Sequence, residues 1–255
     1  KGGWYHINYD NMVFVTGGGS HYVKERIYKA SGIFRKYSFN DSKKSWDMNK
    51  NLWKNTGRKL MYFDGSGTCT ILYDQASNIL YRYISSSKSY KRVSNVIDKL
   101  NGSRYYFYDA NGNRRTSSGW KKVNGSTAYY VCDGGYVTSR YTDQKGTKKV
   151  YDFDYSKNTW VQKKNMWKTV YRSRYYFGSK GVATMSYNNS TKKAYKFTGG
   201  KWKPAKKLIM KIGNANYYFN SAAKRVVKAG KYKTADGYIA YVNRRGVVYK
   251  REYDL

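Results

Sequence analysis

A pattern of strand-forming and turn-forming residues recurs along the chain at nearly constant spacing. Its clearest copy runs from Gly119 to Gly135, where a Trp-led segment, an Asn124-Gly125 turn, an aromatic strand and a second turn follow one another. Asn-Gly between β-forming residues is a strong hairpin signal, because both central residues of a type I′ turn need a positive φ. The repeating unit is therefore predicted to be one β-hairpin.

Counting the residue that closes each aromatic strand gives eleven units, and successive closing residues are 20 to 24 positions apart. These residues are Val15, Phe39, Phe63, Ile84, Tyr108, Val131, Phe153, Phe177, Phe197, Phe219 and Val242. A single hairpin is marginal in water, so each unit must stack on its neighbours to bury its aromatic face. A fixed period of this length is typical of solenoids. We therefore expect an all-β array of β-hairpin repeats that forms a solenoid-like rod.

Two classes of hairpin are distinguished by the residues after the strand-closing position. The next residue is often a turn former: Asn40, Asp64, Asp109, Asp154, Asn220 or Asn243. Four positions after the closing residue, one class has a glycine for which a left-handed backbone is expected: Gly19, Gly67, Gly112, Gly135, Gly181 or Gly246. The other class has a lysine there and an aromatic residue soon afterwards: Lys43 with Trp46, Lys88 with Tyr90, Lys157 with Trp160, and Lys201 with Trp202.

The order of the two classes starts again at Val131, which predicts a super-repeat of five units. Matching pairs such as Trp46 with Trp160 and Tyr37 with Tyr151 support this phasing. We expect a single elongated repeat domain over residues 1–255, with blocks at 3–118 and 119–229 and a partial block at 230–255.

The charge of the chain points to an anionic partner. Lysine and arginine number 50 against 15 acidic residues, a formal net charge of +35, and the excess runs from end to end. Such a charge opposes a compact fold by self-repulsion and concentrates polyanions around the protein. The alternative is a merely solvated surface, although surfaces normally mix both signs.

Several function classes have no support in the sequence. Cys69 and Cys132 have no CxxC or His neighbours, so we expect no metal and no cofactor, and their pairing stays open. His6 and His21 are the two histidines, and no nucleophile or HExxH motif accompanies them, so we expect no enzyme. No apolar run approaches the roughly 20 residues of a membrane span. No signal peptide opens the chain, which starts in mid-pattern, so we expect a piece of a longer exported protein.

The clearest copy of the repeat resembles the cell-wall-binding repeats of Gram-positive surface proteins. The resemblance lies in Gly119-Trp120, Asn124-Gly125 and the segment from Tyr129 to Gly135. Further matches lie at 104–112, 61–67 and 174–181, so the resemblance spans nearly the whole chain. This family includes choline-binding proteins, glucan-binding domains of glucansucrases and clostridial toxin repeats. The resemblance implies a β-hairpin solenoid that tethers or targets a protein at the cell surface. The Lys-class units lack the Gly-Trp opening, which favours a variant architecture.

Four ligand classes can be weighed from the residues. Choline binding needs an aromatic cage, but only Trp4 and Trp120 occupy the position after the glycine that opens the repeat. The net charge of +35 also opposes the binding of a free cation. Glucan binding needs exposed aromatic faces, which tyrosines in every unit could supply. An anionic wall polymer needs periodic cations along one face. Nucleic acid fits basic and aromatic residues too, but no recognition motif is present, so no specific nucleic-acid binding is expected.

We therefore expect a non-catalytic module that binds teichoic or lipoteichoic acid, or a wall glycan, outside the cell. An α-glucan-binding domain, or an adhesin or surface-assembly protein that binds a host glycan, is the alternative. Phe63, Phe177 and Phe219 are expected in the core, whereas the tryptophans of the Lys-class units could be core or surface. The residues expected to contact the ligand are Trp46, Trp53, Trp120, Trp160, Trp167, Trp202, Lys43, Lys44, Lys121, Lys122, Lys163, Lys164, Lys206 and Lys207.

Overall fold

The computed structural model describes residues 1–8, 10–19, 21–102 and 104–254. These residues form β-strands and one short 3-10 helix, η1 (Ser85–Ser87), and they contain no α-helix. The predicted all-β class is therefore confirmed, as a series of small antiparallel sheets. The solenoid, the eleven units and the single domain with its three blocks stay predictions, and residue 255 of the last block lies outside the described residues.

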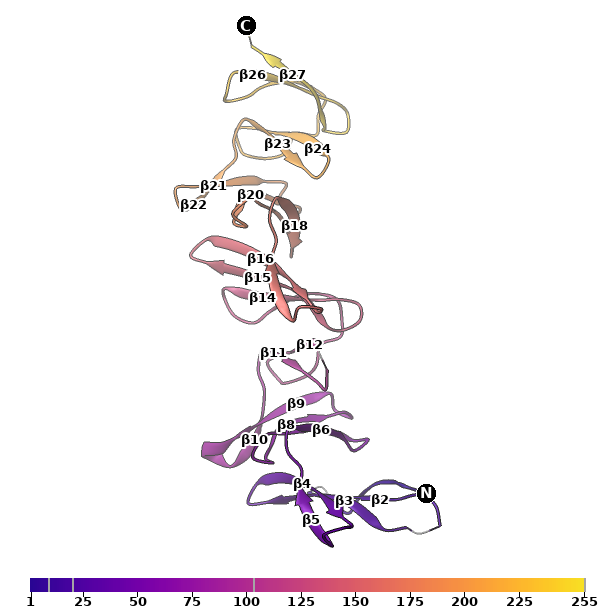
Figure 1. Ribbon diagram of the computed structural model, residues 1–255. Helices are drawn as coiled ribbons and strands as arrows, with labels where there is room; N and C mark the ends of the chain where they lie inside the picture. The colour runs from indigo at the N-terminus through magenta and orange to yellow at the C-terminus, as the bar shows by residue number, and fades with distance from the viewer. Residues whose placement is uncertain (9, 20, 103, 255) are drawn as a thin grey trace. The chain divides into compact units, whose positions relative to one another are not determined.

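The chain divides into two compact units. Unit 1 is Lys1–Ser117 with Val131–Val137, and unit 2 is Ser118–Tyr130 with Thr138–Leu255. Unit 1 contains two five-stranded sheets and a hairpin, with consecutive strands adjacent (Figure 1). The strands are β1 (Gly3–His6), β2 (Asn11–Val15), β3 (Val23–Ala30), β4 (Ile33–Asn40) and β5 (Ser45–Met48), then β6 (Leu52–Asn55), β7 (Lys59–Phe63), β8 (Cys69–Asp74), β9 (Ile79–Ile84) and β10 (Ser89–Arg92), then β11 (Val96–Lys99) and β12 (Tyr105–Tyr108).

Unit 2 contains sheets of the same sizes in the same order, followed by a three-stranded sheet, except that the end residues Val131 of β14 and Val137 of β15 are counted with unit 1. The strands are β13 (Gly119–Lys122), β14 (Thr127–Val131), β15 (Val137–Gln144), β16 (Thr147–Asp154) and β17 (Thr159–Gln162), then β18 (Met166–Val170), β19 (Ser173–Phe177), β20 (Ala183–Asn188), β21 (Ala194–Thr198) and β22 (Lys201–Pro204), then β23 (Leu208–Ile212) and β24 (Ala215–Phe219), then β25 (Gly230–Lys233), β26 (Tyr238–Val242) and β27 (Val248–Tyr253).

The predicted turn formers do form turns. The Oδ1 atom of each accepts backbone N–H groups two to four residues ahead, as Asp64 does from Ser66 and Thr68 at 2.9 and 3.1 Å. The other five that do so are Asn40, Asp109, Asp154, Asn220 and Asn243. Such bonds hold a tight turn with little help from the rest of the protein.

The left-handed glycines are confirmed at five positions: Gly67, Gly112, Gly135, Gly181 and Gly246. The prediction is wrong at Gly19, which has no positive φ in the left-handed range. The loop there is wider, because Thr16 N–H donates to the Tyr22 carbonyl six residues on, whereas Asp64 N–H donates to Thr68 four residues on. In this wider loop the left-handed conformation falls one residue earlier, at Gly18, whose φ is 98°.

Neighbouring sheets bury their side chains against each other within each unit. In unit 1 one cluster joins the first sheet to the second, through Met12, Ile27, Phe34, Met61, Phe63, Cys69 and Leu72. In unit 2 one cluster joins the first sheet to the second, through Val150, Phe177 and Ala183. Another joins the second sheet to the β23–β24 hairpin, through Tyr187, Ala194, Ala205, Met210, Ile212 and Phe219. Phe63, Phe177 and Phe219 have no exposed surface, so their predicted place in the core is confirmed.

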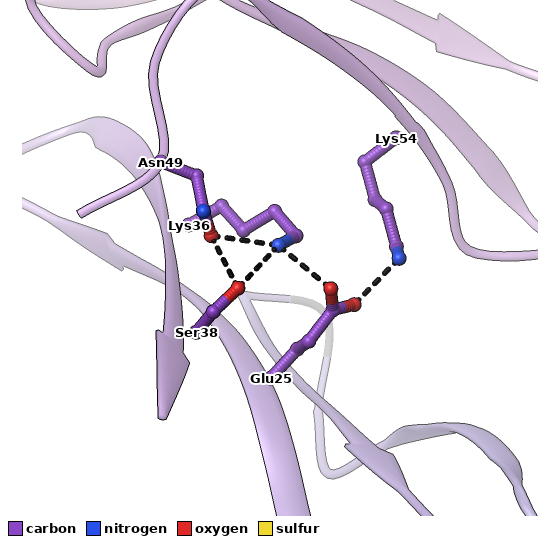
Figure 2. A network of polar contacts seen from close by, with 5 residues as sticks. All are labelled: Glu25, Lys36, Ser38, Asn49 and Lys54. Carbon is purple, nitrogen blue, oxygen red and sulfur yellow. Dashed lines mark hydrogen bonds and ion pairs between the residues drawn. The ribbon is translucent and has the colours of Figure 1, made fainter. Parts of the chain in front are cut away.

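A partly buried carboxylate joins the two five-stranded sheets of unit 1 (Figure 2). Glu25 on β3 accepts a hydrogen bond from Lys36 Nζ at 2.9 Å, and its other oxygen lies 2.5 Å from Lys54 Nζ on β6. The Lys36 side chain is only 3% exposed, and its ammonium also donates to Ser38 Oγ at 3.1 Å and Asn49 Oδ1 at 2.7 Å. A lysine has three N–H donors, so every one of them is used.

Burial and ion pairing have opposite effects on the pKa values of Glu25 and Lys36. Burial alone would raise the pKa of Glu25, but hydrogen bonds from Lys54 and Lys36 leave it below its ordinary value. Burial lowers the pKa of Lys36, and the contact with Glu25 offsets part of that effect. Removing either partner would leave a buried charge without compensation, which is the costly outcome.

Unit 2 contains one carboxylate with two lysines as well, but on different strands. Asp152 on β16 lies 3.2 Å from Lys168 Nζ on β18 and 3.3 Å from Lys163 Nζ, and Ser139 Oγ on β15 donates to it at 2.6 Å. With an offset of 114 residues, Ser139 stands where Glu25 does, and Asp152 stands at the place of its cross-strand partner. The other replacements are Val150 for Lys36 and Lys163 for Asn49.

The variant Glu25→Ser is expected to lose about 3 kcal/mol of unfolding free energy at neutral pH, because it leaves buried Lys36 unpaired. Urea denaturation measures this. Because the pKa of Glu25 is lowered, its stabilisation is present above the ordinary glutamate pKa of about 4.3 and is lost as the pH falls through the lowered value. The deficit of the variant should therefore shrink on acidification.

The arrangement around Asp152 in unit 2 suggests a variant that compensates for the stability lost in Glu25→Ser. A protein with Glu25→Ser, Lys36→Val, Ser38→Asp and Asn49→Lys is expected to regain most of the lost stability. Asp41→Ser, which removes the exposed acid paired with Lys24, should cost less than about 1 kcal/mol. If Glu25→Ser costs no more than this control, the network does not hold the sheets together.

Candidate functional site

All six predicted tryptophans are half-buried. Five pack against an aromatic residue directly opposite on the adjacent strand: Trp46 on Phe39, Trp53 on Tyr62, Trp160 on Phe153, Trp167 on Tyr176 and Trp202 on Phe197, with centroids 4.9 to 5.6 Å apart. Such pairs stabilise neighbouring strands. Each of these rings therefore stabilises its sheet, while the part of the ring that is not buried contributes to the protein surface.

Arg26 on β3 forms an arginine–aromatic cluster on the first sheet of unit 1. It alternates with the core residue Ile27, so it lies on the opposite face of the sheet. Its guanidinium carbon lies 4.4 Å from the ring centroid of Trp46, 5.3 Å from that of Tyr37 and 5.6 Å from that of Tyr28. These distances are within the range of cation–π attraction.

Arg140 on β15 forms the matching cluster in unit 2. Its guanidinium carbon lies 4.6 Å from the ring centroid of Tyr151 and 5.1 Å from that of Trp160. Tyr129 adds a further ring, 5.8 Å from Trp160. The two clusters thus place the same residue types at positions 114 residues apart.

Neither arginine has an acidic partner among the described residues, and the Nε atom of each is buried without a hydrogen bond there. Some other arginines are neutralised, as Arg82 is by Asp98 and Arg115 is by Asp109 at 2.7 Å. Arg114 and Arg225 resemble Arg26 and Arg140, since each lies on a tyrosine ring with a buried Nε that has no hydrogen bond among the described residues. A guanidinium held flat on aromatic rings is already oriented for a carboxylate or phosphate. The two clusters can therefore attract an anion at fixed positions.

The predicted lysines occupy separate turns and strands. Lys43, Lys44, Lys122, Lys164, Lys206 and Lys207 are exposed, and Lys121 and Lys163 are half-buried. Lys163 pairs with Asp152, and Lys43 Nζ lies 3.9 Å from Asp47. The lysines thus contribute to the overall field, while Lys163 has a structural contact as well.

A cavity of about 660 Å³ opens beside Trp120 in unit 2. It is lined by Gly119, Trp120, Tyr130, Thr138, Ser139, Lys168, Thr169 and Tyr171. The Trp120 ring lies 5.5 Å from Tyr130 and 6.4 Å from Tyr171, and its Nε1–H donates to the Thr169 carbonyl at 3.0 Å. Three rings beside hydroxyl groups suit a sugar, because flat faces pack on the sugar ring and hydroxyls bond its oxygens.

Tyr171 reaches this cavity from a strained turn. It begins the two-residue connection between β18 and β19 with a φ of 53°, and its side chain is 51% exposed. The corresponding position in unit 1 is Gly57, with a φ of 81°. A bulky residue in a left-handed conformation costs free energy, and such strain often marks a functional site.

The corresponding places elsewhere in the chain are built differently. In unit 1, Lys54 Nζ lies 5.2 Å from the Trp4 ring centroid and no ring stands at Gly57. In the three-stranded sheet, Lys231 replaces the tryptophan and lies 5.1 Å from the Tyr241 ring. A cavity of about 600 Å³ lies there too, and its lining includes Lys231, Tyr241 and Tyr249. The two cavities therefore differ in their lining, since the one in the second copy has a tryptophan where this one has a lysine.

Sequence reasoning missed Arg26, Arg140 and Tyr171. The first two were detectable, since they recur at the same offset as Tyr37 with Tyr151 and Trp46 with Trp160. Tyr171 was detectable as an aromatic residue at a turn position that holds glycine in the other block.

Some other kinds of site have no support among the residues described. They contain no group of three or more His, Cys, Asp or Glu side chains that could hold a metal ion. No helix in the same part of the chain is long and apolar enough to cross a membrane. Cys69 and Cys132 are both free thiols, and burial raises the pKa of Cys69 to about 12.

No family model matches this chain, and no curated protein matches it. The solved structures that match it include choline-binding proteins, a modular autolysin and an alternansucrase. These are of the kinds that the Gly119–Gly135 pattern resembles, so the resemblance is confirmed at that level.

Three of these matches illustrate the range. An alternansucrase in complex with isomaltononaose is 17% identical, with a TM-score of 0.29, over 98% of this chain and 16% of that one. The autolysin LytC from Streptococcus pneumoniae, with a synthetic peptidoglycan ligand, is 15% identical, with a TM-score of 0.22, over 88% and 52%. The choline-binding domain of CbpL from the same organism is 18% identical, with a TM-score of 0.24, over 87% and 98%. The chain thus spans about one sixth of the alternansucrase and half of LytC.

The variant Tyr171→Gly is expected to be more stable than the wild type by about 0.5 kcal/mol. Relief of the left-handed conformation, roughly 1–2 kcal/mol, exceeds the aromatic contact that is lost, roughly 0.5–1.5 kcal/mol. The reciprocal variant Gly57→Tyr should lose about 1–2 kcal/mol for the same reason. Thermal and urea unfolding measure both, and a clear loss of stability in Tyr171→Gly would show that the tyrosine is structural.

Proposed function

We propose that this chain is a non-catalytic cell-surface module that binds an anionic wall polymer, such as teichoic or lipoteichoic acid, outside a Gram-positive cell. Its hairpins would form one solenoid-like repeat domain of eleven units. The observation that carries the proposal is the pair of arginine–aromatic clusters around Arg26 and Arg140, each lacking an acidic partner among the described residues.

The clusters suit a polymer with regularly placed negative groups. A stacked guanidinium loses little conformational freedom when an anion binds, because the rings already hold it in place. A second cluster of the same kind makes the next contact intramolecular, so weak single contacts add up to tight binding. The surrounding excess of cations increases the local concentration of the polymer.

The remaining predicted residues have supporting roles in this proposal. Exposed lysines would add electrostatic contacts along the polymer, and the half-buried tryptophans would supply apolar surface for its sugar units. These residues are Trp46, Trp53, Trp120, Trp160, Trp167, Trp202, Lys43, Lys44, Lys121, Lys122, Lys163, Lys164, Lys206 and Lys207.

A second candidate function is the binding of an uncharged glucan at the Trp120 cavity. Its three aromatic rings and adjacent hydroxyl groups favour a sugar without charge. Among the matching structures, one is described in complex with isomaltononaose and another with a synthetic peptidoglycan ligand. Both kinds of saccharide are therefore candidates for this cavity.

Binding to purified Gram-positive walls, with and without teichoic acid and over a range of salt, tests the first proposal. Wild-type protein should bind teichoic-acid-containing walls, and binding should fall steeply as salt rises, since each phosphate contact releases counterions. The double variant Arg26→Gln/Arg140→Gln should reduce affinity by about 10-fold or more, consistent with roughly 1.5–3 kcal/mol for a hydrogen bond to a charged group.

Arg82→Gln/Arg115→Gln is the matched control, because it also removes two positive charges but from arginines already paired with Asp98 and Asp109. It should leave wall binding nearly unchanged. Undiminished binding to walls stripped of teichoic acid would refute the polyanion proposal. Gel retardation by dextran at high salt, abolished by Trp120→Ala, would instead support glucan binding, because charge effects are then screened.

A further inference from the structure

A cavity of about 400 Å³ lies among three turns of unit 1, away from both arginine–aromatic clusters. Its lining comes from the end of β1, the β6–β7 turn and the end of β8 with the turn after it. The lining residues are His6, Asn8, Arg58, Lys59, Asp74 and Ala76. This size is within the usual range for small-molecule sites, so the cavity admits more than a single water or ion.

The charges around the cavity are mainly positive. Arg58 is exposed at the turn, whereas Lys59 is 95% buried, with Nζ 5.1 Å from the Phe34 ring centroid. Burial lowers the pKa of Lys59, and Asp10 and Asp74 offset part of this effect. Asp74 is itself committed to its own turn, because its Oδ1 accepts the N–H groups at positions 76 and 77 at 3.0 and 3.1 Å.

His6 adds a polar group with unused bonding capacity. Its Nε2 atom is buried and has no hydrogen-bond partner among the described residues. Burial lowers the pKa of the ring, a hydrogen bond to the Thr56 backbone raises it, and the charges of Arg58 and Lys59 lower it further. The imidazole therefore resists protonation unless a negative charge enters the cavity.

We propose that this cavity is an oxyanion site for phosphate or a phosphate ester. Arg58 offers a forked set of N–H donors, Lys59 adds a positive charge beside the cavity, and His6 offers a ring nitrogen that becomes a donor when protonated. An anion would offset the repulsion between the Arg58 and Lys59 charges and would favour the imidazolium. The site does not depend on the proposed wall binding, since it uses none of the same residues.

Unit 2 does not repeat the donor set. At the corresponding positions it has Lys122, Asn124, Arg172, Ser173, Asn188 and Ser190, so the arginine is retained while the histidine and the buried lysine are replaced. The turn at Arg172 is therefore a control for the effect of one arginine without the rest of the site.

The two histidines of the chain make the test direct, because NMR resolves both ring signals and His21 serves as an internal reference. We would titrate pH with and without sulfate, a dianion that does not itself titrate near neutral pH. Saturating sulfate should raise the pKa of His6 by about one unit, equivalent to about tenfold tighter binding to the protonated form, and leave His21 unchanged. Sodium chloride at equal ionic strength should have no such selective effect.

Arg58→Gln should weaken sulfate binding at least fivefold and remove most of the His6 response, whereas Arg172→Gln should leave both intact. Inorganic phosphate and glycerol 3-phosphate at fixed pH distinguish a site for the free ion from one for an ester. Equal responses of His6 and His21, or a His6 response that survives Arg58→Gln, would overturn the proposal. Wall binding by Arg58→Gln is measured separately, so failure of one proposal leaves the other testable.

Discussion

Attraction between cations and aromatic rings is the interaction on which this protein depends. With 50 basic and 15 acidic residues, ion pairs can neutralise only a minority of the positive charges. Rings accept several of the others: Arg114 lies 3.9 Å from the ring centroid of Tyr106, and Arg225 lies 4.0 Å from that of Tyr217. A tyrosine can thus pack against a neighbouring strand with one part of its surface and hold a cation with another. This dual use explains how a chain poor in aliphatic residues folds under such a charge.

The same interaction separates two kinds of surface. Where an acid is present, as at Arg82 with Asp98, the cation is satisfied within the protein. Where rings alone surround it, as at Arg26 and Arg140, the cation is positioned but its charge is not cancelled. The aromatic residues therefore decide where charge is available to a partner. The cavity beside Trp120 is a different kind of surface, in which Trp120, Tyr130 and Tyr171 lie together.

Local chemistry was predictable from the sequence, and relations across strands were not. Asp64 and Asn220 form the expected turns because the bonds involve residues two to four positions ahead. Gly19 departs from prediction because its loop length differs, and loop length is set by the pairing of the flanking strands. The Arg26 cluster draws residues from three strands, so it depends on registers that spacing alone does not give. The His6 cavity combines the end of β1 with turns at Arg58 and Asp74, which lie 52 and 68 residues after His6, and no local pattern indicates this.

The carboxylate that joins neighbouring sheets lies on β3 in unit 1 and on β16 in unit 2, opposite a serine in each case. An exchange of β3 for β15 alone would bring Ser139 opposite Ser38 and leave lysines without an acid, and the reverse exchange would set Glu25 against Asp152. Only a whole two-stranded hairpin, transferred together with the segment that carries Asn49 or Lys163, keeps one acid with its two lysines. A chimera of the two blocks therefore keeps the network only if its junctions lie outside this segment, so the smallest exchangeable piece is longer than one hairpin repeat.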